Sequence, residues 1–97
     1  MTGAEAIQKE RLRQIKEEGY SPIHDLKFKN GELLTAARCY AAQDVNQYTP
    51  CPLRWPFDKY WWKPSDNPIR NRVKAGALIA ADIDRLQTEQ ETADNLD

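Results

Sequence analysis

The sequence predicts an all-α fold in which three principal helices are joined by a long aromatic-rich crossover loop. Apolar residues recur at helical spacing in three segments, at about residues 3–18, 31–43 and 68–87. Between the last two segments, prolines at positions 50, 52, 56 and 64 exclude a long helix or a central strand. A chain of 97 residues with 40% hydrophobic and 30% charged residues has the size and composition of one domain, so residues 1–97 are taken as a single domain.

The first helix has clear signals at both ends. Thr2 is followed three residues later by Glu5, which predicts a capping box, and Gly19 supplies a stop signal at the C-terminal end. The apolar stripe is thin and consists of Ala4, Ile7, Leu12 and Ile15. Burial of so thin a stripe cannot stabilise the helix alone. We therefore expect polar neighbours of the stripe to turn inward, namely Glu10, Arg11 and Gln14.

The second helix follows a structured connection. Residues 20–29 combine turn-forming residues with apolar anchors, and Asn30 precedes the helix as a predicted cap. The apolar face of this helix is broad and consists of Leu33, Leu34, Ala36, Ala37, Tyr40 and Ala41. The segment is therefore predicted to be the main core helix of the first half of the chain.

The third helix is predicted to begin at Pro68, after a capping Asn67, and to end near Gln87. Its middle, residues 75–81, is rich in alanine and contains Gly76. Small residues permit close approach of another helix, and we expect a homodimer or a higher homo-oligomer to form through this face. Residues 88–97 are acidic and polar, which predicts a frayed tail.

Residues 55–64 contain all three tryptophans and five of the nine aromatic residues. Pro56 could start a short helical turn that reaches Trp62. Two interpretations of the segment remain open. It can be a lid that packs onto a core too small to close by itself, or some rings can form a stacking or cation–π wall for a ligand or partner. Both can hold, because a lid folded over helices leaves a cleft.

Charge is unevenly distributed although the net charge is only −1. A near-neutral total argues against binding to duplex nucleic acid. The aromatic segment and the start of the third helix nevertheless carry a local basic patch. Such a patch can be a solvated surface that Asp58 and Asp66 neutralise, or it can bind an anion, with phosphate the commonest candidate. The predicted ligand-binding residues are Trp61, Trp62, Arg54, Lys63, Arg70 and Lys74.

The remaining reactive residue types predict no catalytic residue, no metal site and no cofactor. Cys39 and Cys51 are too few for a disulfide scaffold, and a single histidine offers no zinc-type ligand set, so we expect reduced thiols. The neighbouring His24 and Asp25 are interpreted as structural. The chain begins without a basic or apolar export segment and contains no membrane-spanning run, which predicts a cytoplasmic protein with no membrane partner.

Short motifs near the two ends of the chain resemble a known family. They are Glu10-Arg11-Leu12-Arg13-Gln14, Glu18-Gly19-Tyr20, His24-Asp25, Gly31-Glu32-Leu33 and the closing helix over residues 75–86. Over about residues 5–42 and 69–86, this pattern resembles the small MazG-like proteins of phages and prophages, relatives of the all-α nucleoside triphosphate pyrophosphohydrolases. The resemblance implies a nucleotide-sized pocket and, for a phage protein, the cytoplasm of a bacterial host. The aromatic segment lies outside it.

The carboxylates that bind magnesium in that family are mostly replaced in this chain. Setting Gly31-Glu32 on the family's Gly-Glu puts Lys29 where the first metal-binding glutamate would stand. A separate alignment of the third helix puts Asn71 and Lys74 where the second carboxylate pair belongs. Only Glu32 persists. Ammonium groups neutralise phosphate but supply no metal-activated water. The resemblance therefore implies a nucleotide pocket with a degenerate metal site.

Three functions remain open at this point. The predicted one is a phage-type, non-catalytic binding protein for a phosphorylated nucleotide, which could sequester a cyclic nucleotide used as a defence signal. The first alternative is a Mg-dependent nucleoside triphosphate pyrophosphohydrolase that uses Glu10, Glu32 and Asp82. The second alternative is a protein-binding inhibitor of a host factor, with the aromatic loop as its contact surface.

Overall fold

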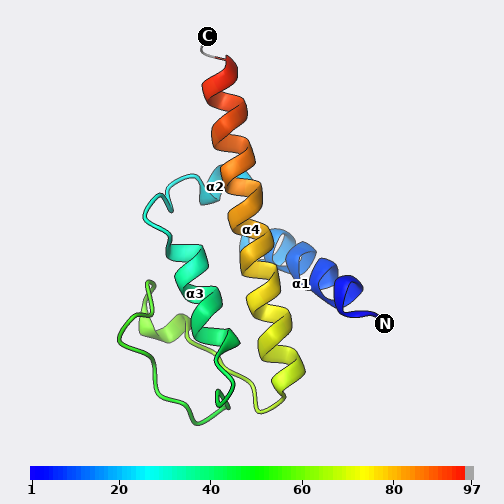
Figure 1. The fold of residues 1–97 in the computed structure, drawn as a ribbon, viewed down its shortest axis with the longest axis vertical. Coiled ribbons are helices and arrows are strands. Elements are labelled where there is room, and N and C mark those ends of the chain that lie inside the picture. Colours follow the sequence, from blue (N-terminus) through cyan, green and yellow to red (C-terminus); the bar gives the residue numbers. More distant parts are fainter. Residues whose placement is uncertain (96–97) are drawn as a thin grey trace.

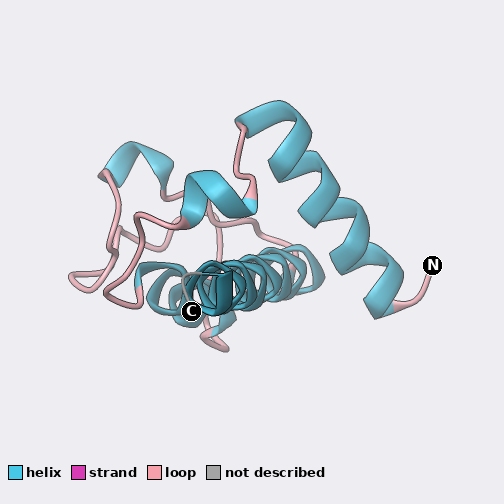
Figure 2. Cartoon of the chain, turned by 90° about the horizontal axis from the view of Figure 1, so that it is seen from above, coloured by secondary structure: helices cyan, strands magenta, loops and turns pink. Residues whose placement is uncertain are grey.

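The computed structural model describes residues 1–95 and, in that range, contains helices and loops but no strand (Figure 2). The predicted all-α class with three principal helices is confirmed. The elements in chain order are α1 (Gly3–Glu18), α2 (Pro22–Asp25), α3 (Glu32–Ala41), a 3₁₀ turn (Lys59–Trp61) and α4 (Pro68–Asn95).

The ends of α1 form as the sequence predicts. The Thr2 hydroxyl accepts a hydrogen bond from the Glu5 amide, and the Glu5 carboxylate accepts one from the Thr2 amide, at 3.2 and 3.1 Å. Gly19 ends the helix at φ 73°, in the left-handed region where a residue with a Cβ is strained. The capping box and the glycine stop are therefore both confirmed.

The start of α3 differs from the prediction, because Asn30 does not cap it. Gly31 occupies the N-cap position at φ 76°, and the helix has no side-chain cap. The Glu32 carboxylate instead accepts a hydrogen bond from the Asn30 amide at 2.6 Å. The left-handed conformation of Gly31 turns the chain into α3, so the helix starts without a capping asparagine side chain.

Helix α4 is the central element, and α1, α2 and α3 all contact it. In Figure 1 α3 runs alongside α4 in the opposite direction, and α1 crosses behind it at a steep angle. The helix extends beyond the predicted end near Gln87, since α4 continues to Asn95. An ion pair one turn apart, Arg85 to Glu89 at 2.9 Å, supports this extension. Residues 96–97 lie outside the described range.

The small-residue face of α4 packs within the chain. Ala75, Ala77 and Ala81 are at most 4% exposed. A Cβ added at Gly76 would lie 2.5 Å from the Cδ1 atom of Ile7 on α1. The glycine therefore permits the close approach of α1, and the chain itself covers the face through which a homodimer was predicted.

The aromatic segment forms a lid over α3, as the first of the two interpretations predicts. The Trp62 ring is 9% exposed and stacks on Tyr40 with ring centroids 4.8 Å apart, while its Nε1 donates to the Thr49 carbonyl at 2.9 Å. Trp55 meets both rings edge-on. The short helical turn begins at Lys59 rather than at Pro56, after Asp58 caps it.

Candidate functional site

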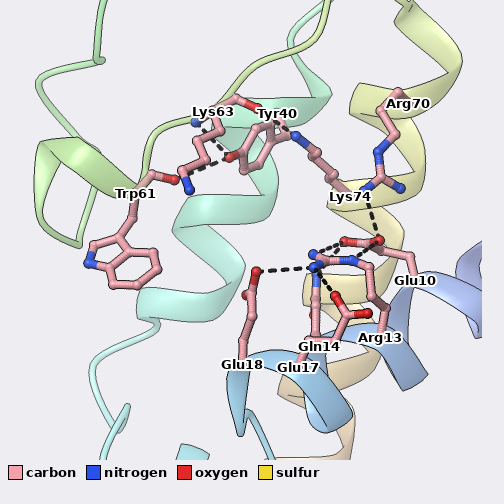
Figure 3. Close-up of polar contacts among 10 residues, drawn as sticks. All are labelled: Glu10, Arg13, Gln14, Glu17, Glu18, Tyr40, Trp61, Lys63, Arg70 and Lys74. Atoms are coloured by element: carbon pink, nitrogen blue, oxygen red, sulfur yellow. Dashed lines mark hydrogen bonds and ion pairs between the residues drawn. The ribbon is translucent and has the colours of Figure 1, made fainter.

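A pocket of about 430 Å³ lies where the lid, α3, α1 and α4 meet. Its volume is in the range of small-molecule sites. One side is aromatic and is formed by Tyr20, Phe28, Tyr40, Trp55, Phe57 and Trp61. The other side carries ionisable and amide groups from α1 and α4, several of which Figure 3 shows close together. The pocket therefore joins stacking surfaces to charge.

Two ammonium groups from the lid and α4 stand at the aromatic side of the pocket. The Nζ atom of Lys74 donates to the main-chain carbonyl of Lys63 and lies 5.4 Å from the centroid of the Tyr40 ring. The Nζ atom of Lys63 lies 5.6 Å from the centroid of the Trp61 ring (Figure 3). Among residues 1–95, neither ammonium forms an ion pair with a carboxylate.

The environment of Lys74 disfavours its positive charge. Burial lowers the pKa of the Lys74 ammonium, and the neighbouring charges of Arg70, Arg13 and Lys63 lower it further, while Glu10 opposes them. A partly buried cation among other cations is stabilised when an anion arrives. The pocket wall around Lys74 is therefore suited to a negatively charged group.

Below Lys74, the carboxylate of Glu10 is held by three neighbours (Figure 3). Arg13 donates to both of its oxygens at 2.8 and 2.9 Å, Arg70 donates at 2.8 Å, and Gln14 donates through Nε2 at 3.2 Å. Burial would raise the pKa of Glu10, but the hydrogen bonds and charges of Arg13 and Arg70 outweigh it and lower the pKa to about 2. Glu10 is therefore ionised and fully engaged in linking α1 to α4.

Two residues that line the same pocket each have a buried oxygen atom that is inaccessible to solvent and has no hydrogen-bond donor within residues 1–95. The two atoms are Oε1 of Gln14 and Oδ2 of Asp25, on side chains that belong to residues only 6% and 0% exposed. The other carboxylate oxygen of Asp25 lies 2.9 Å from Nδ1 of His24. The His24–Asp25 pair, which the sequence left as a structural feature, therefore reaches the pocket wall.

Only half of the predicted ligand-binding residues lie at the pocket. Trp61, Lys63 and Lys74 line it. Arg70 does not line it and instead holds Glu10 from behind. Arg54 is exposed on the loop and Trp62 is packed in the core, so the prediction that they touch a ligand finds no support in their positions.

The three carboxylates of the magnesium alternative do not come together. Glu10 is bound by arginines, Glu32 accepts from a main-chain amide, and Asp82 pairs with Arg85 at 3.3 Å. Within residues 1–95 no group of three or more His, Cys, Asp or Glu side chains could hold a metal ion.

Asn71, at a position where the resemblance implies a carboxylate, serves the fold. It is 2% exposed, donates to the carbonyls of Val45 and Ser65, and accepts from the Ser65 amide at 2.7 Å. Asn71 therefore ties the end of the crossover loop to α4. The cysteines are free, as expected, and burial raises the pKa of the Cys39 thiol, which disfavours its reactive form.

Sequence reasoning assigned no ligand role to the residues of α1 and α2 at the pocket. These are Arg13, Gln14 and Glu18 of α1 and His24 and Asp25 of α2, together with Tyr20 in the turn between the two helices. One usable signal was the thin apolar stripe of α1, from which the inward turn of Glu10, Arg11 and Gln14 was predicted and is confirmed by their burial. The position of Asp25 beside them depends on how α2 folds back, and no local pattern encodes that.

No family model, curated protein or solved structure matches this chain. The class of protein that the fold defines is a small all-α protein with an aromatic cluster against its helices. Among residues 1–95, no helix combines the length and the apolar content needed to cross a lipid bilayer.

Proposed function

We propose that this protein is a non-catalytic binding module for a phosphorylated nucleotide and that the pocket between the lid and α4 is its ligand site. The observation that carries the proposal is the pair of ammonium groups on Lys63 and Lys74, which stand at an aromatic pocket wall without carboxylate partners in the described chain. Phosphate oxygens would accept charge-assisted hydrogen bonds from these two ammonium groups. The half-exposed Trp61 ring offers a face on which a base can stack.

The resemblance to MazG-like phage proteins supports the same ligand class from the sequence side. The resemblance is limited to short motifs. At two positions where this chain differs from the family, Lys74 and Asn71, the side chains have different surroundings. Lys74 faces the pocket, whereas Asn71 holds the loop. A protein that binds a nucleotide at such a site without hydrolysing it could sequester a nucleotide signal, including a cyclic one. The proposal therefore includes three further parts: the protein sequesters the nucleotide, it is encoded by a phage, and it acts in the cytoplasm of the bacterial host.

Isothermal titration of the purified protein with linear and cyclic nucleotides, with and without magnesium, tests the proposal. We expect at least one of these nucleotides to bind saturably, with one or more phosphate groups in the pocket, and we expect no hydrolysis of the bound nucleotide. Replacement of Lys74 by methionine keeps much of the side-chain volume and removes the charge. This variant should bind at least tenfold more weakly, since a charge-assisted hydrogen bond contributes about 1.5–3 kcal/mol.

Arg54→Ala is the matched control for Lys74→Met. Arg54 belongs to the same basic stretch of sequence but does not line the pocket, so its replacement should leave the affinity unchanged. Equal losses in both variants would indicate a diffuse electrostatic attraction instead of a site. Absence of saturable binding by any nucleotide would refute the proposed function.

A further inference from the structure

We propose that the nucleotide bound in this pocket carries phosphate groups at two separate positions, one held by Lys63 and Lys74 and the other by Lys27. This inference rests on the proposed function and narrows its ligand class to nucleotides that are phosphorylated at more than one position, such as a nucleoside 3′,5′-bisphosphate. The observation behind it is that a third lysine, Lys27, lines the same pocket.

The carboxylates at the pocket are already engaged by donors of the chain. Four of them line it, namely Glu10, Glu18, Asp25 and Asp58. Arg13 donates to the first two at 2.8 and 3.2 Å, Nδ1 of His24 lies 2.9 Å from the third, and the main-chain amide of Tyr60 donates to the fourth at 2.9 Å. Each carboxylate therefore has a partner other than a lysine.

The lysines at the pocket are not neutralised in this way. Each of the three ammonium groups stands near an aromatic ring that also lines the pocket, with Nζ 5.2–5.6 Å from the ring centroid. The pairs are Lys27 with Phe28, Lys63 with Trp61 and Lys74 with Tyr40. Within residues 1–95, none of these lysines forms an ion pair with a carboxylate. The pocket therefore offers one more cation than the proposed contact of Lys63 and Lys74 with a single phosphate uses.

Lys27 stands at the opposite end of the pocket from the other two lysines. Leu33 in the first turn of α3 and Tyr40 in its last turn both line the pocket, which therefore runs along about 10 Å of this helix. Lys27 belongs to the connection that enters the N-terminal end of α3, whereas Lys63 and Lys74 both contact Tyr40. Figure 1 shows that connection at one end of α3 and the return of the lid towards α4 near the other.

A row of aromatic rings joins the two ends of the pocket. It runs from Phe28 through Phe57 and Trp55 to Tyr40, with neighbouring centroids 5.1–5.6 Å apart. A nucleoside that packs along this row lies between the two groups of cations, so its phosphates must extend from it in two directions. Lys27 is exposed and has a flexible four-carbon stem, so its ammonium can turn from the Phe28 ring to a phosphate.

Titration with pairs of isomeric nucleotides, without magnesium, tests the inference. A nucleoside 3′,5′-bisphosphate and the corresponding 5′-diphosphate contain the same atoms, but their phosphates stand on opposite sides of the ribose in the first and next to each other in the second. For at least one of the four common bases, we expect the bisphosphate to bind about tenfold more tightly than the diphosphate. Equal affinities, or a preference for the diphosphate, would overturn the inference and leave the proposed function standing. Absence of saturable binding by any nucleotide would refute both.

Lys27→Met tests which residue holds the second phosphate. It removes the charge at similar volume and should lower the affinity for the bisphosphate about tenfold, to that of the diphosphate. Lys29→Met is the matched control, because Lys29 is an exposed lysine two residues further along that does not line the pocket, and this variant should keep the preference. Thermal unfolding checks that both variants are folded.

Two results would overturn the assignment to Lys27. Equal losses in the Lys27→Met and Lys29→Met variants would show that the overall charge of this connection, instead of a contact, supplies the preference. A preference that survives Lys27→Met in full would show that the second phosphate binds elsewhere.

Discussion

The two sides of α4 are held to the rest of the chain by different interactions. Towards α1, contact depends on buried ions: Glu10 binds Arg13 and Arg70, and Arg11 binds Asp84 at 3.1 Å. Towards α3 and the lid, contact depends on rings and small side chains, with Tyr40, Trp55 and Trp62 packed against alanines. The pocket lies between these two sides and takes its ionic wall from one and its aromatic wall from the other.

This difference suggests how stability and binding are separated. The aromatic side gains free energy from apolar area, which depends little on pH or salt. The ionic side gains little from each exposed pair but loses much when a buried charge is left alone. The proposed ligand site between them can have cations without carboxylate partners at its wall, because the aromatic side supplies the stability that those cations cost.

The largest expected loss of stability comes from a substitution on the aromatic side of α4. Trp62→Ala removes a buried ring and its hydrogen bond to Thr49, and should lower the free energy of unfolding by about 3–5 kcal/mol. Urea denaturation at pH 7 measures the change. Trp61→Ala, on a ring that is 52% exposed, is the control and should cost less than about 1 kcal/mol. Equal losses would contradict the different roles of the two rings.

The next effect breaks the ionic side. Glu10→Gln leaves Arg13 and Arg70 without their shared carboxylate and should lower the free energy of unfolding at pH 7 by on the order of 2 kcal/mol. Both arginines are partly exposed and can turn to water, which limits the loss. Thermal unfolding of the wild type and the variant at low and high salt would show a smaller difference at high salt if the contact is ionic.

The pH dependence of unfolding tests separately whether the charge of Glu10 stabilises the ionic side of α4. The pKa of Glu10 is lowered to about 2 in the folded protein, below the value of about 4.3 of an unfolded chain. Its contribution is therefore present above about pH 4 and is lost as the pH falls towards 2. The stability difference between wild type and Glu10→Gln should shrink over this window, as measured by urea titrations at several pH values. A constant difference would show that ionisation of Glu10 is not its source.

Close packing of α1 on α4 predicts an effect of similar or smaller size. Gly76→Leu would force a side chain into the space of Ile7 and should cost about 1–3 kcal/mol. Ile7→Ala in the same chain frees that space, so the double variant should recover part of the loss. If the losses of free energy from the two single variants simply add in the double variant, residues 7 and 76 are not in contact.

The smallest effect concerns the pocket wall. Lys74→Met should leave the melting temperature near that of the wild type or raise it slightly. The physical reason is that burial and neighbouring cations already disfavour the ammonium in the folded protein. This contribution has the opposite sign to that of Glu10, because a lowered lysine pKa destabilises the fold at neutral pH and the cost is relieved as the pH rises. A large drop in melting temperature would mean that Lys74 holds the lid through its bond to Lys63.

The sequence by itself determined the elements whose signals are local. Four local features follow from backbone chemistry within a few residues: the capping box at Thr2, the stop at Gly19, the start of α4 at Pro68, and the exclusion of a long helix or central strand by the prolines. The inward turn of Glu10, Arg11 and Gln14 also followed, because too few apolar residues were available to fill that face of α1.

Only the tertiary structure decided which members of each residue type meet. Trp61 and Trp62 are neighbours in the chain, yet one ring lines the pocket and the other fills the core. Lys74 and Arg70 lie one turn apart, yet the Lys74 ammonium has no carboxylate partner within residues 1–95, whereas the Arg70 guanidinium holds Glu10. Asp25 joins the pocket because α2 folds back onto α4. Such choices depend on contacts between residues far apart in the chain, and the physical reason they escape sequence reasoning is that local spacing carries no information about them.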